Sequence, residues 1–212
     1  MGNQDNNENR FASSELTMGQ MNAIVKKLGG HDNVLRFLRG ELIVSEPTSS
    51  WREQDGVIYF SVTSDGTTGE QWITRLENKG FSVHDHAKSI LRSPNFKTTS
   101  SITYEMAVFK GMFEDRITKN IHFKAKNRRF SVPNAEVACL IREKFSDKEL
   151  EAMGLSRIVI MHGPIIEDFG GNLVLSVELN GIRFWVTTDY IEPNCNLSRK
   201  SGFAFVVSQV KT

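Results

Sequence analysis

The stretch TSDGTTGEQWITRLENKG, residues 63–80, decides how this chain folds. The apolar run VIYF at 57–60 leads into it, and FSV at 81–83 leaves it. A run rich in β-forming residues, a glycine-threonine turn, an amphipathic segment and a final glycine follow one another without spare residues. This order predicts a strand–turn–helix unit in which the helix ends at Gly80.

The sequence of this helix marks both its N-terminus and the face that is expected to be buried. Thr67 stands three residues before Glu70, which is the spacing of a capping box at a helix N-terminus. Trp72, Ile73 and Leu76 recur on one helical face, so they predict the side that packs on a core.

Upstream of this unit the pattern predicts two short helices and a strand. Thr17 with Gln20 forms a capping box, and the helix that it opens is stopped by Gly29-Gly30. A second short helix ends at Gly40, and the apolar residues 42–44 predict a strand. Asp55-Gly56 then stands between two extended segments and predicts a hairpin turn.

Downstream, helices and one strand alternate up to about residue 155. Residues 87–91 mark a short helix, and the alternation over 102–109 predicts a strand. Residues 115–130 indicate a basic helix, and Pro133 is expected at the first position of the next one. Ser146 with Glu149 three residues on is a further capping box.

The last quarter of the chain changes to strands. Apolar residues at 157–161 and alternating residues at 173–179 predict two of them. Asn180-Gly181 predicts a hairpin, and residues 203–210 a final buried strand. The expected fold class is α+β, with one mixed sheet, helices mainly from the first three-quarters and an antiparallel β-meander at the C-terminus.

The composition is that of an ordinary globular protein, with 212 residues of which 39% are hydrophobic and 24% charged. Residues 1–14 are polar and rich in asparagine, so we expect a disordered tail. The remainder, 15–212, is expected to form a single α+β domain. A subdivision into residues 15–155 and 156–212 is the alternative.

The formal net charge of +1 excludes a strong overall field, so an electrostatic partner needs a local patch. Cys139 and Cys195 belong to no CxxC motif, and two cysteines beside seven methionines suit a reducing compartment. The polar first residues do not resemble a signal peptide, and no apolar run approaches the length that spans a bilayer. We expect a cytoplasmic protein.

The turn that precedes the central helix is a candidate anion site. Gly66, Thr67, Thr68 and Gly69 place backbone N–H groups and two hydroxyls at a helix N-terminus, where anions are favoured. The turn is neither a Walker loop nor a GxGxxG dinucleotide turn. The alternative is purely architectural, with Asp65-Gly66 making the turn and Thr67 capping the helix.

The segment RITKNIHFKAKNRR, residues 116–129, holds six Lys or Arg residues and no acid. At 3.6 residues per turn, Ile117, Ile121 and Ala125 share one face. A basic stripe with an aromatic residue on the other side suits phosphate contact combined with base stacking. The alternative is a solvated outer face. The residues predicted to bind nucleic acid are Arg116, Lys119, Phe123, Lys126 and Arg129.

His162 is a weak catalytic candidate. It follows a buried strand and precedes Gly163-Pro164, a place that suits an acid or base in a cleft, with Glu167 and Asp168 near enough in sequence to orient it. The alternative is a histidine at the edge of the core that is hydrogen-bonded to backbone.

Two further features do not predict a site. His84-Asp85-His86 supplies two metal ligands, but no third ligand is predictable nearby, so no metal and no cofactor are expected. Cys139 lies on an apolar helical stripe, which indicates a small buried residue instead of a nucleophile.

Four stretches together resemble one protein family: WREQDGVIYFSVTSDGTTGEQWITRLENKGF, NAEVACLIREKFSDKELEAMGL, IVIMHGPI and GFAFVVSQV. It is a family of bacterial proteins of about 200 residues with no assigned activity, and the likeness covers nearly the whole chain after the tail. The resemblance implies a soluble bacterial protein built as one unit. It implies no activity, cofactor or catalytic residue.

Three functions follow from these features. The favoured one is a non-enzymatic binding or accessory protein that contacts nucleic-acid phosphates through residues 116–129. A small enzyme for a phosphorylated or nucleotide substrate, using residues 65–69 and His162, is the second. A protein-interaction or inhibitor domain is the third. Binding is preferred because no pair of titratable groups stands at a spacing that catalysis needs.

Overall fold

The computed structural model describes residues 16–43, 50–111, 116–166, 172–179 and 185–211. The contacts group the chain into two compact units, residues 1–48 and 49–212. The single domain expected for residues 15–212 stays a prediction.

The N-terminal unit contains two helices, α1 (Met18–Lys27) and α2 (His31–Leu38). The predicted capping box is present, because Thr17 Oγ1 accepts from the Gln20 N–H at 3.3 Å and Gln20 Oε1 accepts from the Thr17 N–H at 2.8 Å. The strand predicted at 42–44 is wrong for its described part, since Leu42 and Ile43 lie in no strand, and residue 44 is outside the described residues.

The larger unit is built on one eight-stranded sheet in the order β1-β2-β3-β8-β4-β6-β5, with β7 paired to the other side of β6. Among the strand pairs of the described residues, β8 and β4 run parallel and the others antiparallel, so the sheet is mixed and the α+β class is confirmed. The strands are β1 (Arg52–Gln54), β2 (Val57–Asp65), β3 (Ser100–Lys110), β4 (Arg157–Ile160), β5 (Ile165–Ile166), β6 (Asn172–Glu178), β7 (Val186–Tyr190) and β8 (Ser201–Lys211).

The C-terminal strands are present, but the last of them does not extend a meander. β6 pairs antiparallel with β4, β5 and β7, whereas β8 returns to the middle of the sheet and separates β3 from β4. The predicted Asp55-Gly56 turn joins β1 to β2, and both residues adopt positive φ, 52° and 71°. The predicted Asn180-Gly181 turn lies outside the described residues.

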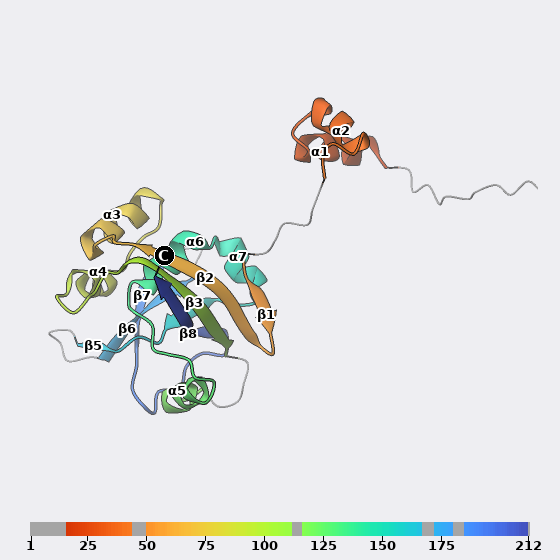
Figure 1. Ribbon diagram of the computed structural model, residues 1–212. Coiled ribbons are helices and arrows are strands. Elements are labelled where there is room, and N and C mark those ends of the chain that lie inside the picture. Colours follow the sequence, from red (N-terminus) through yellow and green to blue (C-terminus); the bar gives the residue numbers. More distant parts are fainter. Residues whose placement is uncertain (1–15, 44–49, 112–115, 167–171, 180–184, 212) are drawn as a thin grey trace, which may run out of the picture. The chain divides into compact units, whose positions relative to one another are not determined.

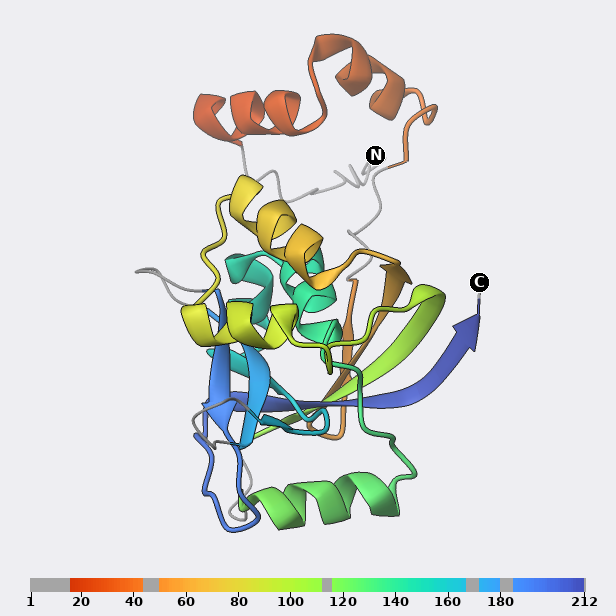
Figure 2. The same ribbon diagram turned by 90° about the vertical axis from the view of Figure 1, so that its left-hand side faces the viewer.

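Helices cover the two faces of the sheet unequally (Figures 1 and 2). One face carries α3 (Gly69–Asn78), α4 (Asp85–Arg92), α6 (Val137–Lys144) and α7 (Asp147–Ala152), and the other carries α5 (Thr118–Asn127). The alternation of strand side chains makes both cores. In β2, Ile58 and Phe60 face the core under the four helices, and Val57 faces the core under α5.

Two local predictions are wrong by a few residues. The capping box of α3 is formed by Thr68 with Gln71, because Thr67 instead donates its N–H and its hydroxyl to Asp65. Pro133 does not open a helix, since α6 begins only at Val137.

The helix α4 is capped by His84, whose Nδ1 accepts from the His86 N–H at 3.3 Å. The third capping box, Ser146 with Glu149 at the start of α7, is confirmed. The basic helix expected over 115–130 is α5, which is shorter at both ends.

Gly69 offers a test of the contact between α3 and α4. A Cβ at this position would lie 1.8 Å from the carbonyl oxygen of Leu91. We expect Gly69→Ala to lower the free energy of unfolding by at least about 2 kcal/mol, because backbone atoms must move apart. Chemical denaturation measures the change. Gly163→Ala is the control, since a Cβ there meets no atom within 4 Å. Equal stability of the two variants would contradict this packing.

Candidate functional site

The helix α5 is held firmly against its face of the sheet. At its start, the N–H groups of Thr118 and Lys119 donate to the carbonyl oxygens of Cys195 and Pro193, both at 3.0 Å. Ile121 and Ala125 are buried in the core beneath it. These anchors fix which side of the helix points to solvent.

The solvent side of α5 and of the residues that follow it carries most of the predicted contact residues. Lys119, Phe123, Lys126 and Arg129 are all exposed, and 63% of the Phe123 surface is accessible. Arg116 differs, because it is only partly exposed and its Nε donates to the Leu197 carbonyl oxygen at 2.8 Å. Arg116 therefore connects the segment before α5 to the segment at Leu197. The other four residues are the "α5 face".

The ion pairs formed among the described residues do not include the cations of the α5 face. Among the described residues, no carboxylate forms an ion pair with Lys119, Lys126 or Arg129. This face therefore presents a cluster of positive charge directly to solvent.

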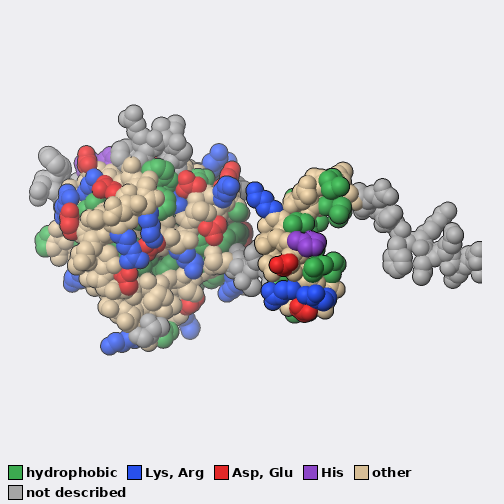
Figure 3. Space-filling model, turned by 90° about the horizontal axis from the view of Figure 1, so that it is seen from above, with side chains coloured by type: hydrophobic (Ala, Val, Ile, Leu, Met, Phe, Trp, Pro, Cys, Tyr) green, Lys and Arg blue, Asp and Glu red, His purple; other side chains and the backbone are tan. Residues whose placement is uncertain are grey.

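The side of the larger unit that carries α3 and α4 has charges of both signs. Seen from above, cationic and anionic side chains are interspersed (Figure 3). Arg75 bridges Asp65 and Glu143, both at 2.5 Å, and Arg92 pairs with Glu70 at 2.7 Å. The α5 face differs from this pattern, because it gathers three exposed cations that form no ion pair among the described residues.

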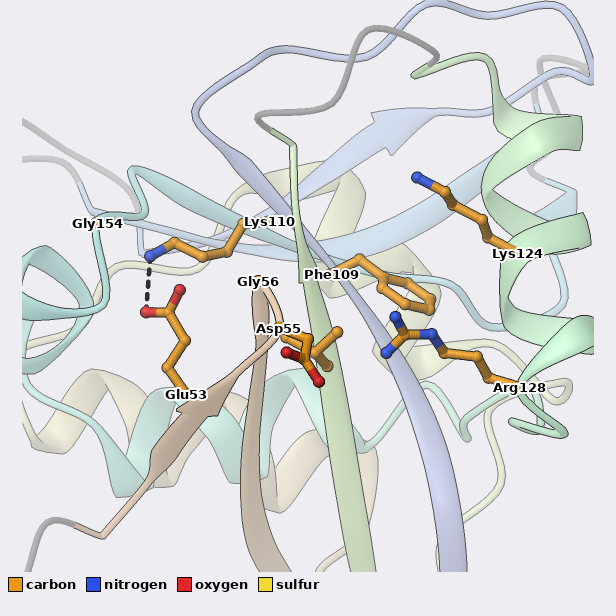
Figure 4. A pocket seen from close by; sticks show the side chains of 9 residues that line it. Glu53, Asp55, Gly56, Phe109, Lys110, Lys124, Arg128 and Gly154 are labelled. Atoms are coloured by element: carbon orange, nitrogen blue, oxygen red, sulfur yellow. Dashed lines mark hydrogen bonds and ion pairs between the residues drawn. The ribbon is translucent and has the colours of Figure 1, made fainter.

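A cavity of about 660 Å³ opens beside α5, between that helix and the β1–β2 turn (Figure 4). Lys124 and Arg128 approach it from α5, and Phe109 and Lys110 from the end of β3. The Arg128 guanidinium lies 5.5 Å from the centre of the Phe109 ring. The remaining lining residues are Glu53, Asp55, Gly56, Val57 and Gly154.

Sequence reasoning missed this cavity. Lys124 and Arg128 belong to the basic segment, but residues 53–57 and 109–110 are brought to them only by the sheet. No spacing along the chain connects these three segments.

The turn at 65–69 uses its own N–H groups. Those of Thr67 and Thr68 donate to Asp65 Oδ1 at 3.1 Å and to Gln71 Oε1 at 2.9 Å. Gly66 N–H donates to the carbonyl oxygen of Thr99 at 2.9 Å. An anion at this turn would have to displace these internal acceptors.

The negative charge at this turn is the carboxylate of Asp65. Hydrogen bonds from Thr67 and Arg75 lower the pKa of Asp65 to about 2, so its carboxylate is ionised at neutral pH. Gly69 packs directly on α4. The geometry favours the architectural alternative for residues 66–69.

His162 is buried and both of its ring nitrogens are engaged. Nε2 accepts the N–H of Leu175 at 2.8 Å, so Nδ1 carries the proton and donates it to the Gly163 carbonyl oxygen at 2.6 Å. Burial lowers the pKa of His162 to about 4. The imidazole joins the end of β4 to β6. Glu167 and Asp168, expected to orient it, are outside the described residues.

The three predicted sites do not converge. The 65–69 turn precedes α3 on one face of the sheet, and α5 lies on the other. His162 is enclosed between strands. No common cleft among the described residues unites them.

A buried polar cluster was also missed. Glu136 is 1% exposed and accepts from the Thr99 N–H at 3.0 Å and from the Tyr104 hydroxyl at 3.3 Å. The Thr99 hydroxyl donates to Glu136 and lies 2.9 Å from that of Ser64. Burial raises the pKa of Glu136. The cluster ties β2, β3 and the start of α6 together, and its polar groups satisfy one another.

Neither the histidine pair nor the cysteines belong to a group of metal ligands among the described residues. The rings of His84 and His86 stack at 5.3 Å, and no group of three or more potential metal ligands occurs among the described residues. Cys139 and Cys195 are free thiols, and burial raises the pKa of the Cys139 thiol.

Comparison with protein-family models, with curated proteins and with solved structures yields no match. No activity, cofactor or residue role is therefore carried over from a known protein. Within the described residues, no helix combines the length and the apolar character that crossing a membrane requires.

His162 makes the stability of the protein depend on pH. Its pKa is about 4 in the fold and near 6.5 when unfolded, so the unfolded chain binds the proton first as the pH falls. The full contribution is present above pH 6.5 and is lost as the pH falls towards 4, in total about 3 kcal/mol. We expect this slope in urea denaturation measured across that range.

His162→Gln is the matched variant, because an amide oxygen accepts from the Leu175 N–H but does not titrate. The variant should lose this part of the slope between pH 6.5 and 4. An unchanged slope would show that His162 is not held neutral in the fold.

Proposed function

We propose that this protein is a non-enzymatic nucleic-acid-binding protein of the bacterial cytoplasm, and that the α5 face contacts the phosphates of a single strand. The observation that carries the proposal is the solvent-facing group of Lys119, Lys126 and Arg129, which has no carboxylate partner among the described residues. Phosphate contact by such cations releases condensed counterions, which drives binding.

Phe123 supports single-stranded over duplex nucleic acid. Its ring is 63% exposed in the middle of the cationic face. An exposed ring between lysines gives an unpaired base a surface on which to stack, while the cations contact the backbone. A base pair inside a duplex cannot reach such a ring.

The predicted enzymatic function gains less support. The internal hydrogen bonds of residues 65–69 and of His162 leave neither positioned for chemistry on a substrate. The free thiols of Cys139 and Cys195 support the cytoplasmic part of the proposal. The family resemblance supports the bacterial part.

The charge of the α5 face is tested by reversing it. We expect the triple variant Lys119→Glu, Lys126→Glu, Arg129→Glu to lose retention on heparin and binding to a single-stranded oligonucleotide. For partial variants, each lost phosphate contact lowers the slope of log affinity against log salt by about 0.7. Fluorescence anisotropy at several salt concentrations measures this.

The control carries the same change of charge on exposed residues elsewhere, Lys97→Glu, Lys148→Glu, Lys211→Glu. It should reduce binding far less, and the circular dichroism of both triple variants should match that of the parent protein. If both triple variants lose binding equally, the loss depends on net charge alone and the proposal is wrong.

Phe123 is tested separately from charge. We expect Phe123→Ala to weaken binding to a single strand by about 1–3 kcal/mol, the usual contribution of one stacked base. Phe123→Trp should preserve the affinity, because it keeps an aromatic surface. If both variants bind like the parent protein, the ring makes no contact with a base.

A further inference from the structure

We propose that the cavity between α5 and the β1–β2 turn is a subsite for one unpaired nucleotide, with its phosphate towards α5 and its sugar or base towards the turn (Figure 4). The inference deepens the proposed function and rests on it, because the nucleotide belongs to the strand that crosses the α5 face. Its residues are Glu53, Asp55, Phe109, Lys110, Lys124 and Arg128.

The wall formed by α5 supplies the groups that a phosphate needs. Lys124 and Arg128 are four residues apart and therefore lie on one side of the helix, where both line the cavity. The Arg128 guanidinium lies 5.5 Å from the centre of the Phe109 ring, a contact that restricts its orientation. A planar guanidinium held in this way presents paired donors to phosphate oxygens.

The opposite wall has the reverse polarity. Asp55 stands in the β1–β2 turn and is exposed, so its carboxylate is available to accept hydrogen bonds. Lys110 donates to Glu53 Oε2 at 2.9 Å, and this ion pair largely balances the charge at that end. The cavity therefore has the Arg128 guanidinium at the α5 wall and the Asp55 carboxylate at the turn.

A nucleotide matches this division of charge better than a simple anion does. Its phosphate is negative, whereas its sugar hydroxyls and most base edges carry hydrogen-bond donors for a carboxylate. The volume of about 660 Å³ falls in the range of sites for small organic ligands. Lys124 follows Phe123 in α5 and projects about 100° around the helix from it, so a strand on the α5 face has to turn round the helix to place a nucleotide here.

Two substitutions separate the two walls. Arg128→Ala removes the phosphate contact, and Asp55→Asn removes the carboxylate charge while asparagine still tolerates the positive φ of 52°. The ligands are adenosine monophosphate, cytidine monophosphate, inorganic phosphate and a single-stranded oligonucleotide. Calorimetry with the full chain measures affinity, and thermal unfolding without ligand checks that each variant folds.

We expect Arg128→Ala to weaken binding of both monophosphates and of inorganic phosphate by about tenfold or more. Asp55→Asn should weaken binding of the nucleotides and leave that of inorganic phosphate unchanged, because only the nucleotide reaches the turn. Lys148→Ala, on α7, is the matched control and should bind like the parent protein.

The subsite and the proposed function fail in different ways. If the oligonucleotide binds through Lys119, Lys126 and Arg129 but the monophosphates do not bind, or bind Arg128→Ala and Asp55→Asn as well as the parent, the subsite is overturned and the proposed function stands. If the monophosphates need Arg128 and Asp55 while charge reversal on the α5 face leaves oligonucleotide binding unchanged, the cavity is supported as a nucleotide site and the role of the face is overturned.

Discussion

The constraint on which the larger unit depends is the insertion of its last strand between β3 and β4. β8 pairs antiparallel with β3 from Ile102 to Lys110 and parallel with β4 from Arg157 to Ile160. The fit is close, since a Cβ on Gly202 would lie 2.5 Å from Val108 Cγ1 and 2.9 Å from Leu155 Cδ1. Without β8 the sheet would fall into two separate halves.

The candidate site depends on the same strand through a chain of aromatic contacts. Phe205 on β8 packs against His122 on α5 at 5.6 Å and against Phe109 on β3 at 5.8 Å. Phe109 in turn lies beneath the Arg128 guanidinium. The cations beside the cavity are therefore positioned by a core that closes only when the C-terminal strand is in place.

The sequence predicts turns and helix faces that depend on a few neighbouring residues. It does not predict features formed by segments that are distant in the chain. The Asp55-Gly56 turn and the segregation of α5 into an apolar and a cationic side follow from local periodicity. The predicted cap of α3, Thr67 with Glu70, is wrong, however, because Thr67 bonds Asp65 and the adjacent Thr68 caps the helix. The central place of β8, the Glu136 cluster and the cavity lined by Arg128 need partners tens of residues away, and no local pattern records them.

The buried or partly buried arginines differ from the exposed cations of the α5 face in their charge partners. Arg142 is fully buried, yet it donates to Asp147 at 2.8 Å, and Arg157 pairs with both Glu178 and Asp189. Such cations are accounted for by the fold, because an uncompensated charge at a buried place is strongly destabilising. The exposed cations of the α5 face satisfy no such need. They repel one another weakly across solvent. Under the proposed function, the gain from binding an anionic ligand would offset this repulsion, in a chain whose net charge is only +1.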